Sequence, residues 1–233
     1  MPTTDADGSD GLPRCAWANR GPALMREYHD REWGIPVRDE RGLFERLCLE
    51  GAQAGLSWLT ILTRREAYRA AFAGFDVDIL ADWPDSRVEE LLADSGIIRN
   101  RAKIASVLTN ARAARRLREE AGGLDALVWG ANGGVPEQPG YPDVAHVPAA
   151  TAASEALSKE LRRRGFRFVG PVIVESLRTA AGLVNAHTTD CFRHAELAAP
   201  AARPAAPVAP AAPVSAAAPV PAGTVGTGVP GDR

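Results

Sequence analysis

The sequence predicts an all-α domain, and three observations support this fold class. Apolar residues recur at helical spacing in several segments, whereas no segment alternates apolar and polar residues as a strand would. Residues that commonly begin or end helices flank those segments. The composition, with 45% hydrophobic and 24% charged residues, is typical of a globular protein with one sizeable core.

Local signals mark the start of four of the predicted helices. Asp39 can cap the first, Ser57 the second, and Thr151 the fifth, because their side chains can accept hydrogen bonds from free backbone N–H groups. The last helix begins at Pro171, a residue favoured in a first helical turn. The Gly- and Pro-rich stretch 130–147 is expected to be the longest internal loop. The predicted helices cover residues 40–48, 58–72, 87–94, 98–120, 152–164 and 171–182.

The composition changes sharply near Leu197. Eight of the eighteen prolines lie at or after Pro200, within a stretch of Ala, Pro, Val and Gly. Prolines this frequent block both helix and sheet, so we expect residues 197–233 to be a disordered Ala/Pro-rich tail. Residues 1–11, which are polar and acidic, are expected to be a disordered leader. The folded domain is therefore predicted to be 12–196.

Charge, hydropathy and cysteine content limit the class of protein. The chain has no apolar run as long as the roughly 18 residues that a membrane span needs. Its start lacks the basic and apolar regions of a secretory signal. Three cysteines are few and odd in number, which argues against a disulfide framework. We expect a cytoplasmic protein with no membrane partner, and a monomer.

Two pairs of possible metal ligands lie at opposite ends of the predicted domain. Cys15 and His29 are near its start, and His187 and Cys191, four residues apart, are near its end. If the second pair is helical, its two side chains share one face. Two thiolates and two imidazoles form a common closed zinc site. Taken singly, each residue is more often a buried thiol or a surface histidine, and two other histidines could substitute: His146 and His194.

One carboxylate lies among aromatic residues in the first part of the predicted domain. Glu50 follows an apolar helix and is followed by glycines. A pocket of aromatic rings around a carboxylate suits a flat, cationic ring. Alternatively, the aromatic residues belong to the core and Glu50 is a solvated charge at a helix end. The aromatic residues are Trp17, Tyr28, Trp33 and Trp58.

The segment 159–167 carries five basic residues and one acidic residue, although the chain has a net charge of −2. Within it a helix ends at Gly165, an apolar turn follows, and a new helix starts at Pro171. This pattern is a helix-hairpin-helix, whose exposed N–H groups can hold a DNA phosphate. The alternative is an ordinary helix connection, with basic side chains that suit the helix dipole.

A series of short, uncommon sequence motifs extends from Arg14 to Cys191. They are RCAW at 14–17, YHDREWG at 28–34, LEG at 49–51, QAGLSW at 53–58, GIIR at 96–99, ALSK at 156–159, GF and FVG within 165–170, and GLVN at 182–185 followed by His187. In these motifs the chain resembles the DNA-3-methyladenine glycosylase I family. The resemblance implies a helix-hairpin-helix DNA glycosylase fold. It also implies one structural zinc ion that joins the N- and C-terminal parts, bound by Cys15, His29, His187 and Cys191.

The resemblance also implies a function and its residues. The chain is expected to be a monofunctional glycosylase that flips N3-methyladenine out of alkylated double-stranded DNA and excises it by hydrolysis, in base excision repair. Glu50 is the implied catalytic residue, and the base-binding residues are Tyr28 and Trp58, helped by Trp17 and Trp33. The expected DNA contacts are Gln53, Leu56, Arg164, Gly165, Phe168 and Gly170, of which Gln53 and Leu56 fill the gap left by the base.

Two departures from related enzymes refine this expectation. Lyase-type relatives carry a lysine just after the hairpin, where this chain has Pro171 and Val172, so no AP-lyase activity is expected. The family usually has an acid before His187, where this chain has Ala186. Two other functions stay open: a zinc-containing module that binds DNA without cutting a bond, and a structural zinc domain that acts through its Pro-rich tail.

Overall fold

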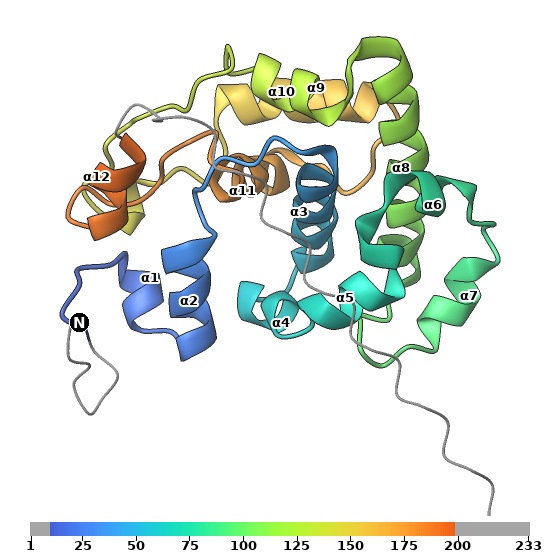
Figure 1. Cartoon of the computed structure of the whole chain (residues 1–233), viewed down its shortest axis with the longest axis horizontal. Coiled ribbons are helices and arrows are strands. Elements are labelled where there is room, and N and C mark those ends of the chain that lie inside the picture. The colour runs from blue at the N-terminus through green and yellow to red at the C-terminus, as the bar shows by residue number, and fades with distance from the viewer. Residues whose placement is uncertain (1–9, 199–233) are drawn as a thin grey trace, which may run out of the picture. The chain divides into compact units, whose positions relative to one another are not determined.

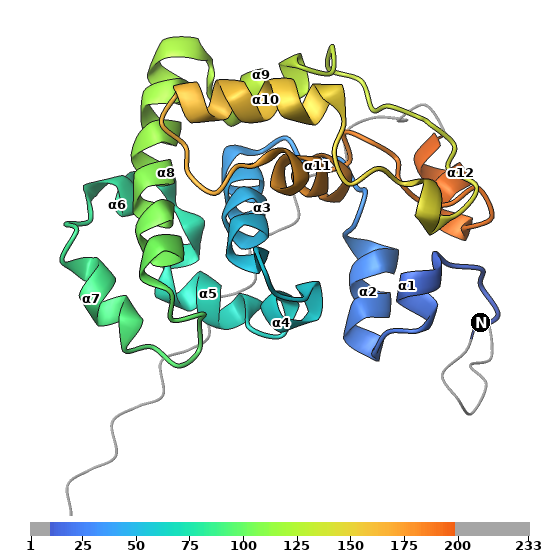
Figure 2. The same cartoon turned by 180° about the vertical axis from the view of Figure 1, so that it is seen from behind.

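Helices make up the fold of this computed structural model, which describes residues 10–198 (Figures 1 and 2). An isolated bridge between Glu137 and Val184 is the only β pairing within that range. The all-α prediction is confirmed. Most of the predicted disordered leader 1–11 and tail 197–233 lies outside the described residues, but Leu197 and Ala198 belong to helix α12 and Asp10 pairs with Arg14, so the folded part extends beyond the predicted 12–196 at both ends. The helices are α1 Ala16–Asn19, α2 Ala23–Arg31, α3 Glu40–Gln53, α4 Trp58–Leu62, α5 Arg65–Ala71, η1 Ala73–Phe75, α6 Val77–Asp82, α7 Arg87–Leu92, α8 Arg101–Ala121, α9 Gly123–Gly130, η2 Val144–His146, α10 Ala152–Arg163, α11 Pro171–Ala180 and α12 Phe192–Ala198.

The predicted caps begin the helices as expected. The side chain of Asp39 accepts a hydrogen bond from the Gly42 amide, and that of Ser57 accepts one from the Thr60 amide. Thr151 forms a reciprocal capping box with Ser154 at the start of α10. These local bonds satisfy N–H groups that the helices leave unpaired, so the boundaries predicted from them are accurate.

Other boundaries differ from the prediction. The helix expected over 58–72 is two helices, α4 and α5, which meet at Thr63 and Arg64. The Thr63 hydroxyl donates to the carbonyls of Leu59 and Thr60, and such side-chain bonds compete with the helical ladder. The long helix begins at Arg101 instead of 98, because the side chain of Asn100 caps it.

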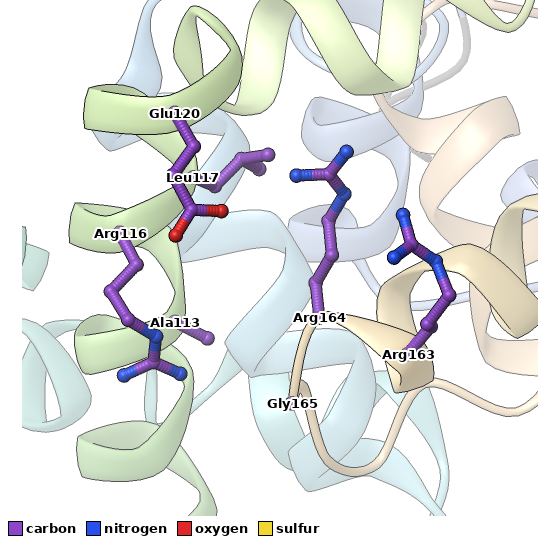
Figure 3. A pocket seen from close by; sticks show the side chains of 7 residues that line it. All are labelled: Ala113, Arg116, Leu117, Glu120, Arg163, Arg164 and Gly165. Carbon is purple, nitrogen blue, oxygen red and sulfur yellow. The ribbon is translucent and has the colours of Figure 1, made fainter.

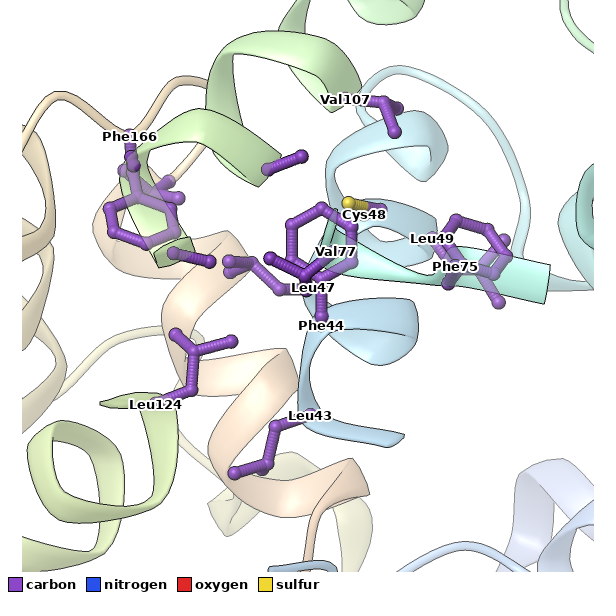
Figure 4. Close-up of a cluster of buried hydrophobic side chains, with 14 of the residues drawn as sticks. Leu43, Phe44, Leu47, Cys48, Leu49, Phe75, Val77, Val107, Leu124 and Phe166 are labelled. Atoms are coloured by element: carbon purple, nitrogen blue, oxygen red, sulfur yellow. The ribbon is translucent and has the colours of Figure 1, made fainter. Parts of the chain in front are cut away.

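The core gathers around α3, which packs against α8, α9 and α11. Its apolar face is fully buried, as Figure 4 shows for Leu43, Phe44 and Leu47. The two ends of α3 therefore have fixed positions. Its C-terminal end, where Glu50 and Gln53 lie, contacts α4, and Gly51 lies against Phe168 in the turn between α10 and α11. No helix within residues 10–198 is long and apolar enough to cross a membrane.

The end of α11 lies directly against the segment that follows α2. A Cβ atom on Gly182 would lie 2.6 Å from the Pro36 nitrogen and 2.7 Å from the Gly34 carbonyl oxygen. Gly182 also has a φ of +76°, which L side chains rarely adopt. The amide of Val37 donates to the Ala181 carbonyl at 3.0 Å. This contact brings residues near position 30 beside residues near position 185.

Candidate functional site

A small cavity, which we call the Glu50 cavity, lies between α2, α3, α4 and α11. Its volume is about 230 Å³. Binding sites for drug-sized ligands typically measure about 300–1,000 Å³, so this cavity suits a smaller molecule. The structure thus brings Glu50 together with all four of the aromatic residues predicted to surround it. The lining residues are Trp17, Met25, Tyr28, Trp33, Glu50, Gln53, Trp58, Ser176 and Thr179.

The aromatic rings form two pairs along the cavity wall. The ring centroids of Tyr28 and Trp58 are 5.2 Å apart at an interplanar angle of 46°. Those of Trp17 and Trp33 are 5.1 Å apart and perpendicular. The indole N–H of Trp58 is buried and has no hydrogen-bond partner among the described residues. Such walls can stack on a flat ring, and their π faces attract a cation.

Glu50 is a buried carboxyl group, with 5% of its surface exposed. Within residues 10–198 no group donates a hydrogen bond to it. Burial raises the pKa of Glu50 to about 8, and the charge of Arg46 offsets this only in part. The interpretation of Glu50 as a solvated charge is therefore wrong. A cation in the cavity would favour its ionised form.

Tyr28 faces Glu50 from α2. Burial, together with the charge of Glu50, raises the pKa of the Tyr28 phenol well above its usual range. The phenol therefore stays neutral and can donate a hydrogen bond at any physiological pH. The cavity thus combines one titratable acid with neutral aromatic walls.

Cys15, His29, His187 and Cys191 form a buried cluster whose ligand atoms all lie within 4.8 Å of one another. His29 Nε2 and His187 Nδ1 are 3.2 Å apart, and Cys191 Sγ is 3.5 Å from each of them. A tetrahedral zinc site has N···N separations of about 3.4 Å and N···S separations of about 3.6 Å. The spacings among His29, His187 and Cys191 therefore match those of a tetrahedral metal site, and the cluster could hold a metal ion.

Outer hydrogen bonds fix the orientation of both imidazoles. His29 Nδ1 lies 2.7 Å from Asp30 Oδ1, and Arg14 pairs with the same carboxylate at 2.8 Å. His187 Nε2 lies 3.1 Å from the Trp33 carbonyl oxygen. Such partners hold metal-binding histidines in one tautomer. Each imidazole therefore turns a single nitrogen toward the cluster.

The expectation that His187 and Cys191 share a helical face is wrong, since both precede α12 and lie in a turn. The turn brings them together because the Cys191 amide donates to the Thr188 carbonyl. Of the two alternative histidines, His146 is exposed and pairs with Asp143, and His194 is outside the cluster.

The Cys/His cluster and the Glu50 cavity share their aromatic walls. The Trp33 ring centroid is 4.6 Å from that of His187, and the Trp17 centroid is 5.2 Å from that of His29. The two indoles thus line the cavity on one side and contact the cluster on the other. The cluster and the cavity are therefore in contact through these two side chains.

The turn between α10 and α11, residues 164–170, exposes backbone donors. The amides of Phe168, Val169 and Gly170 donate to no acceptor within the described part of the chain. Asn110 of α8 holds the turn by bonding both the amide and the carbonyl of Arg167, at 2.7 and 3.1 Å. Phe168 has a φ of +52°, unusual for a bulky residue. Free amides ahead of a helix are suited to an anion.

Basic side chains flank this turn. Figure 3 shows Arg116 and Glu120 of α8 on one side of a second cavity, and Arg163 and Arg164 on the other. Arg163 and Arg164 both pair with Glu160, at 2.6 Å. Arg164 is therefore only partly available to an external anion.

Gln53 and Leu56 lie at the two ends of a tight turn after α3. Leu56 is 39% exposed, and Gln53 lines the Glu50 cavity. The structure thus places Gln53 in the cavity wall and Leu56 on the surface, three residues further along the chain.

Three residues of the cavity wall were missed in the sequence: Met25, Ser176 and Thr179. Ser176 and Thr179 are one turn apart on α11, but Glu175 and Arg178 on the same helix are polar too, so the sequence pattern does not single them out. Met25 gives no signal either.

Comparison with known proteins gives consistent matches. The model of the methyladenine glycosylase family matches residues 17–194. DNA-3-methyladenine glycosylase 1 of Escherichia coli K12 is 44% identical over 180 residues, which is 77% of this chain and 96% of that protein. A crystal structure of a 3-methyladenine DNA glycosylase I shares 46% identity, with a TM-score of 0.75, over 77% of this chain and 98% of that one. A Staphylococcus aureus structure that describes 3-methyladenine recognition shares 34% identity, with a TM-score of 0.74, over 78% and 96%.

Proposed function

The chain belongs to the methyladenine glycosylase family, and from this premise we propose that it excises N3-methyladenine from alkylated double-stranded DNA. It acts as a monofunctional hydrolase of the N-glycosylic bond, the first step of base excision repair. One observation carries the proposal: Glu50 is a buried carboxyl without a hydrogen-bond donor, amid aromatic walls. A buried carboxyl is costly unless it is paired or used.

Methylation at N3 gives adenine the charge that this cavity lacks. The methylated ring is a flat cation, so it stacks on Tyr28 and Trp58 and attracts the ionised form of Glu50. Trp17 and Trp33 complete the wall. Ordinary adenine is neutral and gains less from the carboxylate. The discrimination therefore rests on charge more than on shape.

The same charge makes the reaction possible with few catalytic groups. When the N-glycosylic bond breaks, its electron pair neutralises the ring, so the base leaves without protonation. A water oxygen then bonds to the sugar C1′, and its proton passes to solvent. Glu50 stabilises positive charge during this process. No lysine lines the cavity within the described residues, which supports hydrolysis without strand cleavage.

The base must leave the duplex to reach Glu50. The amides of 168–170, including those of Phe168 and Gly170, bind a DNA phosphate, and Gly165 and Arg164 contribute to the same backbone contact. Leu56, which is exposed three residues after the cavity-lining Gln53, fills the space left by the base together with Gln53. Binding should then weaken steeply as salt rises.

The Cys/His cluster holds one structural zinc ion through Cys15, His29, His187 and Cys191. The near-tetrahedral spacing of the ligand atoms and the two oriented imidazoles support this assignment. A zinc ion with four protein ligands supplies folding energy and no open position for a reactant. Its effect on excision would therefore be through Trp17 and Trp33.

The experiment that tests this function measures breaks in the DNA strand. Methylated duplex is incubated with the protein and separated by electrophoresis before and after alkali. We expect alkali-sensitive abasic sites and no breaks without alkali. Breaks without alkali would contradict the monofunctional assignment. If the protein binds the DNA but produces no alkali-sensitive sites, it is a binding module and not a glycosylase.

A further inference from the structure

Lys103 is a half-buried lysine on the first turn of α8 that reaches the C-terminal end of α3. Its Nζ donates hydrogen bonds to the carbonyl oxygens of Ala52 at 2.8 Å and Ala54 at 2.6 Å. Burial lowers the pKa of Lys103. A cation at the C-terminal end of a helix is favoured by the helix dipole, and it satisfies carbonyls that the helix leaves unpaired.

These two carbonyls flank the start of a tight turn, residues 53–56. Ala54 has φ −43° and ψ 116°, Gly55 has φ +77°, and the Leu56 amide donates to the Gln53 carbonyl at 2.6 Å. These values define a type II turn, in which Gly is required at the third position. A Cβ on Gly55 would meet nothing within 4 Å, so no side-chain packing supports the middle of the turn.

We propose that Lys103 is a positioning residue for base flipping, which holds the 53–56 turn rigid while Leu56 enters the DNA duplex. This inference rests on the proposed function. A side chain that enters the duplex meets steric resistance from the stacked bases. Without the two Lys103 hydrogen bonds, the exposed 53–56 turn would change its conformation instead of displacing the base. The ammonium of Lys103 links both sides of Gln53 to α8, which the core holds in place.

A direct contact between Lys103 and a DNA phosphate is the main competing role. Two of the three ammonium donors already bind Ala52 and Ala54, and the side chain is half-buried. The two roles have different signatures. Loss of a phosphate contact reduces the slope of log affinity against log salt by about 1, whereas loss of a tether leaves that slope unchanged.

Lys103→Met tests the proposal, since it keeps the aliphatic stem and removes the donors. Excision from methylated duplex under excess enzyme should fall at least tenfold. The dissociation constant for free 3-methyladenine, measured by fluorescence of the cavity tryptophans, should change less than twofold. The salt slope of DNA binding should be unchanged. Arg101→Met is the matched control: it removes a cation from the same helical turn whose partner is Glu89, and it should keep wild-type excision.

Gly55→Ala supplies a second variant that acts on the turn without touching Lys103. It strains only the backbone, since the space around Gly55 is open. It should show the same loss of excision with unchanged base binding, and combining it with Lys103→Met should add little. Weaker binding of the free base in Lys103→Met, a reduced salt slope, or full excision by Gly55→Ala would each overturn the proposal. Wild-type excision, measured alongside, tests the proposed function separately.

Discussion

Replacing Glu50 by Gln should reduce excision of N3-methyladenine about a hundredfold. Gln keeps the shape of the side chain but removes its charge, and it points an N–H donor toward the donor edge of the base. An opposite charge about 4 Å away contributes about 4 kcal/mol at an effective dielectric of about 20. From this we subtract the work of ionising Glu50 at pH 7, about 1 kcal/mol for a pKa of about 8. As the bond breaks, the positive charge passes from the base to the sugar and stays near Glu50, so the loss of the remaining attraction, about 3 kcal/mol, corresponds to about two powers of ten in kcat/KM.

The same substitution should raise the stability of the fold. Between the pKa of 4.5 in the unfolded chain and about 8 in the folded state, the folded protein keeps a proton that the unfolded chain releases. The free energy of unfolding therefore falls as the pH rises through this window. A neutral Gln has no such loss, so the variant should unfold at a higher temperature than the wild type at pH 8, and the difference should shrink toward pH 5.

Both quantities are measured on one preparation with known zinc content. Excision under excess enzyme should also show a pH dependence: kcat/KM rises as Glu50 ionises near pH 8 in the wild type and is flat there in Glu50→Gln. An excision rate within threefold of wild type would refute the role of Glu50 in recognition. A lower melting temperature with normal excision would show that Glu50 is a structural charge.

Three further predictions concern the metal, the fold and the wedge. Cys191→Ala should lose the bound zinc and melt about 10 °C lower, since several kcal/mol are lost, whereas Cys48→Ala, which changes a buried cysteine outside the cluster, should keep its zinc by elemental analysis. Gly182→Ala should lower the free energy of unfolding in urea by about 3 kcal/mol or more, because its Cβ would overlap backbone atoms; Gly130→Ala, which meets nothing within 4 Å, should stay within about 1 kcal/mol. Leu56→Ala should slow excision from duplex DNA at least tenfold without changing the binding of free 3-methyladenine, and unchanged turnover would place the wedge elsewhere.

The sequence predicted those parts of the fold that depend on local bonds. Asp39, Ser57 and Thr151 each cap the helix that their position indicated. Helices α2 and α9, which have no side-chain cap, were missed, and so was α6, although Asp76 caps it. The fold class followed from periodicity, because periodicity reports which face each helix buries.

The site was predicted unevenly, for a physical reason. The sequence motifs shared with the family identified Glu50 and its aromatic neighbours, and in the structure these residues line one cavity. The ionisation of Glu50 could not be predicted, since it depends on burial by several helices. The hydrogen bonds from Lys103 to the Ala52 and Ala54 carbonyls also could not be predicted from the sequence. They join residues about fifty positions apart, and any residue type carries a backbone carbonyl.

The central claim is that this chain releases N3-methyladenine from DNA, and the most direct test is to identify the released base. Methylated duplex DNA is incubated with the zinc-containing protein, the polymer is removed, and the soluble bases are separated by chromatography. The account predicts a peak of free 3-methyladenine that grows with time and is nearly absent with Glu50→Gln. No release of 3-methyladenine by folded, zinc-containing wild-type protein would contradict it.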